Sequence, residues 1–193
     1  SCPTAQMLQF PVATMVRFCH NHGMLQVTNR PQWWTVQGGA RHYVQAITAL
    51  VADTRLNSPA HGVRPDPEAF GGRGGVRVHT PAGEELFDRV ILATHSDQAL
   101  ALLQDPSAHE RSVLGAIGYQ PNVAVLHTDT AVMPARRAAW SAWNYERAQD
   151  AGRESARVCL HYWINRLQSL PFGQDVIVSL NPVRTIDPAK ILQ

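Results

Sequence analysis

Two short stretches carry residue types that could do chemistry at the start of a helix. In the first, Gly38-Gly39 opens a predicted helix, and Arg41 and His42 follow shortly after. Backbone amides at a helix start that lack side chains can approach an anion closely, although a simple helix cap is the plainer explanation of a glycine pair taken alone. In the second, Thr94-His95-Ser96-Asp97 ends an apolar run. Ligands of open α/β sheets lie at such strand ends.

Other catalytic patterns are incomplete. Ser96 has His95 and Asp97 as sequence neighbours, but no Gly-x-Ser-x-Gly elbow surrounds it, and a catalytic triad is assembled in space. The glycine-rich run 71–75 precedes a strand, so it predicts a hairpin connection and not a dinucleotide fingerprint. The nine histidines include no helical i, i+4 pair with a third ligand, so the sequence predicts no metal site.

The elements that must position the second stretch begin at residue 75. Val76 and Val78 alternate with polar residues, which is the period of a half-exposed strand. Residues 81–83 predict a turn, and residues 84–87 would pair back across it. The continuous apolar run Val90–Ala93 predicts a strand covered on both faces. A helix capped by Ser96 would follow directly.

Two amphipathic helices are predicted earlier in the chain. In residues 11–22 the apolar positions recur with the helical period, Pro11 suits the first turn and Gly23 suits the position just past the end. The helix after Gly39 would bury one face, formed by Tyr43, Val44, Ile47, Leu50 and Val51. Trp33-Trp34 ends an extended approach to it, and residues 55–64 predict an irregular strand interrupted by a proline.

The C-terminal half predicts an antiparallel sheet. Ser107 and Glu110 form a capping box for a helix that precedes it. Polar links are expected at 129–137 and 147–154, and the strands at 122–127, 139–146, 157–165 and 176–180. The fold class expected for the whole chain is therefore α+β, with helices flanking sheets.

The strings Trp33–Gly39 and Val90–Asp97, with the hairpin before the second, are similar to those of the flavin-containing amine oxidoreductases, a family of FAD-dependent enzymes that includes bacterial predicted FAD/NAD-binding proteins. The resemblance extends over most of the chain. It implies a parent enzyme that passes a hydride from a small-molecule substrate to FAD. In such enzymes the cofactor supplies the chemistry, and the protein supplies orientation and a dry cavity.

The resemblance also implies roles for particular residues, although it assigns no catalytic residue. The expected cofactor-binding residues are Gly38, Gly39, Arg41, Ala60, Thr94 and His95. The expected substrate-cavity residues are His42, Trp143, Tyr145, His161 and Trp163. The alternative for the aromatic residues is that they form ordinary sheet core and cross-strand pairs.

The resemblance implies three parts of the chain. Residues 1–32 would be a helical part of the substrate domain, residues 33–106 a partial FAD-binding domain, and residues 107–193 the antiparallel sheet of the substrate domain. The chain has no dinucleotide fingerprint, and both of its ends look cut, so we expect an internal fragment that does not hold FAD alone. The competing expectation is a non-catalytic α+β module for binding or oligomerisation.

Composition limits the remaining classes of function. The formal charge of +2 is too small to indicate a nucleic-acid partner. No apolar run approaches the roughly 18–20 residues that span a bilayer. Cys2, Cys19 and Cys159 are widely spaced, which favours a reducing compartment, so a cytoplasmic location is expected. Surfaces that would face the missing parts of a flavoprotein, at Trp33, Trp34 and the strands around Trp140 and Trp163, predict a homodimer or a higher homo-oligomer with at least one of these tryptophans at the contact.

Overall fold

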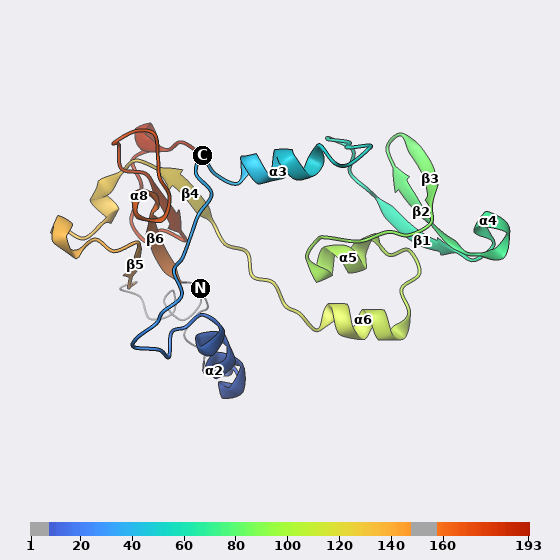
Figure 1. The fold of residues 1–193 in the computed structure, drawn as a ribbon, viewed down its shortest axis with the longest axis horizontal. Helices are drawn as coiled ribbons and strands as arrows, with labels where there is room; N and C mark the ends of the chain where they lie inside the picture. The colour runs from blue at the N-terminus through green and yellow to red at the C-terminus, as the bar shows by residue number, and fades with distance from the viewer. Residues whose placement is uncertain (1–7, 148–157) are drawn as a thin grey trace. The chain divides into compact units, whose positions relative to one another are not determined.

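The computed structural model describes residues 8–147 and 158–193, and it has a mixed α+β fold with two antiparallel sheets (Figure 1). The chain divides into two compact units, which are described separately. One unit comprises Leu50–Pro121, and the other comprises Ser1–Ala49 with Asn122–Gln193. Cys2 and all but the first residue of the predicted link 147–154 lie outside the described residues.

The unit Leu50–Pro121 contains a three-stranded meander. Strands β1 (Gly62–Asp66), β2 (Gly75–Thr80) and β3 (Gly83–Phe87) pair antiparallel in the order β1-β2-β3, as the green part of Figure 1 shows. The predicted alternating strand, its turn and the strand that pairs back are thereby confirmed. Strand β1 begins later than the predicted strand 55–64, because its pairing with β2 extends from Gly62 to Asp66.

The connection between β1 and β2 contains the short turn α4 (Ala69–Gly72). Phe70 and Gly71 have φ angles of 53° and 70°, in the left-handed region that favours glycine. Gly74 also has a positive φ, of 82°, immediately before β2. The glycine-rich run therefore reverses the chain between two antiparallel strands, which confirms the prediction of a hairpin connection.

The predicted buried strand Val90–Ala93 is wrong for this chain. These residues have no regular secondary structure and belong to no strand of either sheet, and the side chain of Ile91 is 92% exposed. An apolar run can form a covered strand only where neighbouring strands and helices meet it. Among the described residues, none supplies such a neighbour.

A helix does follow this run, but its cap differs from the prediction. Helix α5 (Ser96–Leu102) starts at Ser96, and the capping position belongs to His95. The side chain of Gln98 accepts a hydrogen bond from the His95 backbone N–H at 3.3 Å. The Ser96 hydroxyl is buried and has no hydrogen-bond partner in the described part of the chain, so Ser96 is not the cap.

Helix α6 (Ala108–Gly115) packs against α5 within the same unit. Its capping box is confirmed, because Ser107 Oγ accepts from the Glu110 backbone N–H at 3.2 Å. In return, Glu110 Oε2 accepts from the Ser107 backbone N–H at 2.7 Å. The reciprocal bonds satisfy two backbone donors that the helix start would otherwise leave unpaired.

The other unit contains a four-stranded antiparallel sheet, with strands β4 (Ala124–His127), β5 (Trp143–Glu146), β6 (Cys159–Trp163) and β7 (Ile177–Leu180). Their order is β4-β7-β6-β5, which confirms the predicted antiparallel sheet. Strand β5 is shorter than the predicted 139–146, because Ala139 belongs to the 3-10 turn η2 (Arg137–Ala139) and the pairing with β6 begins only at Trp143.

One face of this sheet is covered and the other is exposed. The apolar core on the covered face is formed by Val132, Met133, Ile177 and Ile186, with Val125, Trp140 and Trp163 packed against it. The 3-10 turn η1 (Thr130–Val132) contributes part of this cover. On the opposite face, Trp143 and Tyr145 of β5 are 63% and 54% exposed. The sheet therefore has one covered, core-bearing face and one open aromatic face.

Helices α2 (Val12–Asn21) and α3 (Arg41–Thr48) lie where the sequence predicts them. Gly23 follows α2 with a φ of 63°, as its predicted place past the helix end requires. The predicted buried faces are wrong, since Tyr43, Val44, Ile47, Leu50 and Val51 are all exposed. Periodicity identifies the side of a helix that could be buried, but it does not supply the surface that buries it.

Two short elements remain: the helix α8 (Ile164–Leu167), which follows β6, and the 3-10 turn η3 (Pro188–Lys190) near the C-terminus. Isolated bridges pair Val63 with Leu103 and His127 with Ile191. Over the ranges 8–147 and 158–193, no helix has the length and apolar character needed to cross a membrane.

Candidate functional site

The candidate site is a line of polar side chains on the covered face of the β4-β7-β6-β5 sheet. Because side chains alternate between the faces of a strand, the pairing of Asn144 with His161 and of His161 with Ser179 places these residues on one face. His127, His161 and Ser179 have 0%, 1% and 0% of their surface exposed. Three polar side chains are thus enclosed within the protein.

A continuous hydrogen-bond chain connects them. His127 Nε2 lies 2.7 Å from Ser179 Oγ, and Ser179 Oγ lies 2.6 Å from His161 Nδ1. His161 Nε2 then lies 2.9 Å from Glu146 Oε2. Glu146 is the outermost member, and its other oxygen, Oε1, lies 2.6 Å from Arg184 Nε. The chain therefore extends from the interior to an ion pair at the surface.

The donors and acceptors of this chain can be assigned in one direction. The backbone N–H of Asp129 donates to His127 Nδ1 at 3.0 Å, so that nitrogen carries no proton in the neutral ring. His127 then donates from Nε2 to Ser179, Ser179 donates to His161 Nδ1, and His161 donates from Nε2 to the Glu146 carboxylate. Each buried group in this assignment has a partner, which is how polar side chains are tolerated in an interior.

Burial keeps the innermost imidazole neutral. The pKa of His127 is lowered from its usual value, chiefly because burial penalises the charged form. The carboxylate of Asp129 raises the pKa of His127 by electrostatic attraction, whereas the neighbouring His161 lowers it further. The neutral ring agrees with the hydrogen-bond assignment, in which Nδ1 accepts a backbone proton.

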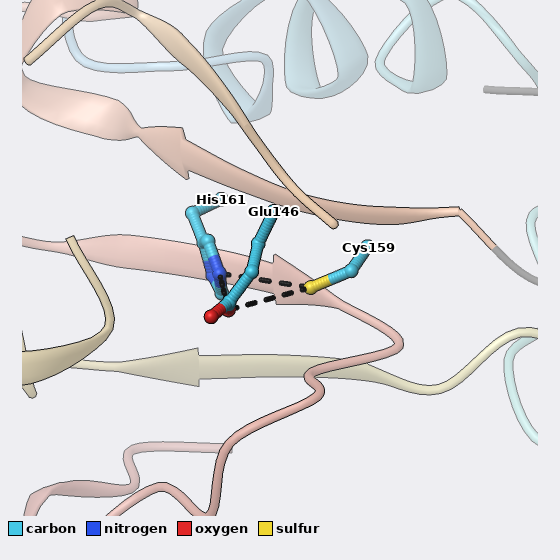
Figure 2. A group of neighbouring side chains, drawn as sticks. All are labelled: Glu146, Cys159 and His161. Atoms are coloured by element: carbon cyan, nitrogen blue, oxygen red, sulfur yellow. Dashed lines mark hydrogen bonds and ion pairs between the residues drawn. The ribbon is translucent and has the colours of Figure 1, made fainter. Parts of the chain in front are cut away.

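A thiol joins the outer end of the chain. Cys159 Sγ lies 3.6 Å from His161 Nε2 and 3.9 Å from Glu146 Oε2. Cys159 and His161 are two residues apart on β6, and Glu146 pairs with Cys159 across from β5. Figure 2 shows the three side chains pointing toward one another, with imidazole, carboxylate and thiol converging. The three possible ligand atoms all lie within 4.8 Å of one another.

Two kinds of chemistry can be considered for these residues. Ser179, His161 and Glu146 follow the nucleophile–base–carboxylate order of a hydrolase triad. Ser179 has no exposed surface, however, and both of its partners in the hydrogen-bond chain are imidazoles. A substrate carbonyl cannot reach this hydroxyl, so the order of residues does not support hydrolysis. The outer trio of imidazole, carboxylate and thiol consists instead of side-chain types that can bind a metal ion.

The first group of predicted cofactor residues lies at the start of α3. Gly38 and Gly39 have φ angles of 80° and 91°, which side chains rarely adopt. A Cβ atom on Gly38 would lie 2.3 Å from His42 Nε2, so the imidazole of His42 folds back over that glycine. Arg41, the first residue of the helix, is exposed. The structure brings Gly38 and His42 together.

The second group lies in the unit Leu50–Pro121. Ala60 lines a hollow of about 290 Å³ together with Asp53, Arg55, Ser58, Val78, Thr80, Glu85 and Phe87. His95 stacks on Tyr119, with ring centroids 4.3 Å apart and planes 9° from parallel. The Tyr119 hydroxyl accepts from the backbone N–H of Ser96 at 3.0 Å, and Thr94 is exposed just before it. Thr94 and His95 thus lie at the entry to α5.

The predicted substrate-cavity residues on the sheet divide between its two faces. Trp143 pairs with Tyr162, and both lie on the open face, where Tyr145 also lies. His161 and Trp163 lie on the covered face. The four predicted cavity residues of the sheet, which are Trp143, Tyr145, His161 and Trp163, therefore do not line one cavity. Trp163 is ordinary core there, because it contacts the Trp140 ring edge-on at 5.2 Å and donates to Asp175 Oδ1.

Sequence reasoning identified His161 but not the residues that contact it. Glu146, Cys159 and Ser179 were not expected to meet, because they lie on three different strands. One signal was present in the sequence: Cys159 and His161 have the two-residue spacing that places side chains on the same face of a strand. The strand pairing that adds Glu146 and Ser179 requires the structure.

Comparison with known proteins adds no homologue to these observations: neither a family model nor a curated protein matches the chain.

Proposed function

We propose that the chain is part of an FAD-dependent oxidoreductase of the amine-oxidase type, in which the parent enzyme transfers a hydride from a small-molecule substrate to the flavin. The observation that carries the proposal is the run of β1, β2 and β3 followed at once by the apolar segment Val90–Ala93. This is the order of elements that the resemblance of the sequence implies for the second half of an FAD domain.

The exposure of that apolar segment supports a larger parent. Ile91 is 92% exposed, and leaving such a side chain in water forgoes about 1.5–3 kcal/mol of burial. An apolar segment that pairs with no described strand is what remains when the neighbouring strands belong to another part of a protein. The polar entry to α5, at Thr94 and His95, would then lie at the end of a central strand, where ligands bind.

The hollow beside Ala60 gives a second, independent support. The resemblance implies that backbone groups near Ala60 contact the adenine of FAD, and Ala60 lines a hollow of about 290 Å³. The apolar side chains of Val78 and Phe87 lie on its wall, as a planar aromatic ligand requires. The backbone N–H of His61 donates to His79 O at 2.8 Å, so this group is committed to the sheet.

In such an enzyme the described residues would position the cofactor, and the flavin would supply hydride acceptance. Gly39, whose φ angle is positive and where an added Cβ would meet no atom within 4 Å, leaves bare backbone just before α3, where a flat ring system or an anion can approach. The open aromatic face, with Trp143 and Tyr145, would exclude water from the substrate.

The proposal is tested by the reading frame that surrounds the chain and by its protein product. A Gly-x-Gly-x-x-Gly turn encoded upstream is expected, and the product of that frame should be yellow, with one FAD per chain. The isolated 193-residue chain should be colourless. An upstream sequence without this turn, or a colourless full product, would contradict the proposal.

A matched pair of variants in the full product tests the hollow. Ala60→Arg fills the space beside β2 and should lower the FAD content at least about tenfold, since it removes contact area that the ring would use. Ala82→Arg places the same side chain on the exposed turn between β2 and β3 and should leave the FAD content unchanged. Equal FAD content in both variants would show that the adenine does not bind beside Ala60.

The open aromatic face favours a second candidate function, a non-catalytic module for binding or oligomerisation. Trp143 and Tyr145 expose 63% and 54% of their surfaces, and Tyr162 packs edge-on against Trp143 at 5.7 Å. Exposed apolar patches of this kind mark association sites. A colourless full product that forms a stable oligomer would favour this function over the oxidoreductase.

A further inference from the structure

We infer that Glu146, Cys159 and His161 form a binding site for a single divalent metal ion of the zinc type, held between β5 and β6. The inference does not depend on the flavin proposal, because none of the three residues is needed there to hold FAD. It revises the expectation, drawn from histidine spacing, that the chain has no metal site. That expectation considered pairs on helices, whereas these ligands come from two adjacent strands.

The distances fit a common metal ion. A tetrahedral zinc ion with bonds of about 2.0–2.3 Å holds its ligand atoms roughly 3.2–3.6 Å apart. The observed separations are 2.9 Å from His161 Nε2 to Glu146 Oε2, 3.6 Å from Cys159 Sγ to His161 Nε2, and 3.9 Å from Cys159 Sγ to Glu146 Oε2. Side-chain shifts of a few tenths of an ångström would bring the three atoms onto one ion.

The donor set selects the metal. One thiolate, one imidazole and one carboxylate are the three ligand types that zinc accepts, and a thiolate is a poor ligand for magnesium or calcium. With Cys159 as thiolate and Glu146 as carboxylate, the ligands carry two negative charges, and the Glu146 charge is shared with Arg184. Three protein ligands leave the fourth tetrahedral position for water or for another ligand.

The groups behind the ligands are those that orient metal sites. A metal-bound imidazole commonly holds its second nitrogen in a hydrogen bond, and His161 Nδ1 already lies 2.6 Å from Ser179 Oγ. When Nε2 binds the ion, its proton is displaced and Nδ1 carries one instead, so His161 and His127 both donate to Ser179 Oγ, and the hydroxyl proton of Ser179 turns away from both rings. Arg184 fixes the carboxylate from its other oxygen, at 2.6 Å. The ligands are therefore held before the ion arrives.

An ion can also reach the site. His161 and Cys159 are buried, but the Glu146 side chain retains 20% of its exposure and lies at the outer end of the polar chain. The carboxylate is thus the ligand that a hydrated ion would meet first. The thiol and the imidazole would then replace further waters, and the net proton loss is the thiol proton of Cys159.

Cobalt(II) is the probe that tests the site on the purified 193-residue chain, because a cobalt–thiolate bond gives a charge-transfer band that other ligands lack. One equivalent should bind with that band, and zinc should displace it. Cys159→Ser should abolish the band. It should also lower zinc affinity by more than the roughly 10–100-fold lost when a residue that only hydrogen-bonds to a ligand is replaced. Cys19→Ser removes a cysteine on α2 and should leave both properties unchanged.

Glu146→Gln gives a second variant at the outer edge of the site, in case the buried substitution prevents folding. It keeps the size of the side chain while removing the charge, so it should lower zinc affinity and abolish the rise in melting temperature that zinc gives the parent chain. Circular dichroism of the metal-free variants checks that they fold. A chain that takes up no cobalt, or a folded Cys159→Ser variant that binds as tightly as the parent, would overturn the assignment.

Discussion

The Asp129 carboxylate joins the end of β4 to the C-terminal turn, because its Oδ1 lies 3.0 Å from Lys190 Nζ, 61 residues later in the chain. Its other oxygen accepts from the backbone N–H of Asp187 at 3.0 Å, and the backbone N–H of Ala131 donates to Oδ1 at 3.2 Å. The pKa of Asp129 is lowered to about 2, mainly by the Asp187 N–H and then by Lys190. A buried carboxylate with three such partners strongly favours its charged form.

This pKa predicts a loss of stability in acid. A carboxyl group whose pKa is near 3.9 in the unfolded chain and about 2 in the folded chain stabilises the fold by about 2 kcal/mol above pH 4. That contribution disappears as the pH falls from about 4 toward 2, because the carboxylate is then protonated in the folded chain as well. Asp129→Asn should remove this part of the acid dependence in urea melts. Lys190→Met should remove a smaller part, since the backbone donors remain. Equal acid slopes in all three chains would contradict the assignment.

The exposure of Ile91 predicts that a charge is tolerated there. In the isolated chain, Ile91→Asp should change the free energy of unfolding by no more than about 0.5 kcal/mol, because the side chain is already in water. Val63→Asp, in β1 of the same unit, is the contrast: Val63 is 4% exposed, and burying an unpaired charge there costs several kcal/mol. An Ile91→Asp chain that fails to fold would restore the buried strand that the sequence predicts.

The capping box of α6 gives a prediction of smaller size. Ser107→Ala removes the acceptor of the Glu110 N–H and should destabilise the unit Leu50–Pro121 by about 1 kcal/mol. Ser112→Ala makes the same chemical change at an exposed position inside the helix, and it should be neutral or slightly stabilising because alanine is the better helix former. Thermal melts of both variants measure the difference in their stability. If the capping box does not form, Ser107→Ala will be no less stable than Ser112→Ala.

Self-association is the fourth prediction, and the structure reduces the number of tryptophans that could lie at the contact. The sequence pointed to Trp33, Trp34, Trp140 and Trp163. Trp33 and Trp34 are 69% and 87% exposed, whereas the other two pack against the apolar core. We expect a homodimer or higher oligomer in sedimentation at micromolar concentration, with Trp33 or Trp34 at the contact.

A pair of variants separates specific association from general stickiness. Replacing both Trp33 and Trp34 by serine should raise the dissociation constant at least about tenfold, as loss of a buried aromatic anchor does. Val27→Ser alters another exposed apolar residue in the same unit and should have little effect. A parent chain that sediments as a monomer at every concentration would refute the expectation.

Local features of the fold were predictable from sequence, and features that depend on a partner surface were not. Val76 and Val78 alternate with polar residues, and β2 forms there. Ser107 and Glu110 cap α6 because both bonds lie within four residues. The apolar run around Ile91 has an equally clear pattern, but a covered strand needs neighbours that no described residue supplies.

The candidate site shows the same limit. His161 was expected to be functional, yet its importance was attributed to a cavity with Trp143, which lies on the other face of the sheet. Which face His161 shares with other residues depends on the register of the paired strands, because successive side chains of a strand lie on opposite faces. The contacts with Glu146 and Ser179 join three strands, and single-strand patterns carry no information on which strands become neighbours.

The buried hydrogen-bond chain also makes incorrect strand pairings costly during folding. If β6 slipped by one residue against β7, Leu160 and Tyr162 would take the places of Cys159 and His161 on the covered face. Ser179 would then be enclosed without the imidazole that accepts its hydrogen bond, and this unpaired hydroxyl would cost about 1–3 kcal/mol. An entirely apolar face would tolerate such a slip more readily. The polar line therefore favours the observed register of β6 against β7 over a register shifted by one residue.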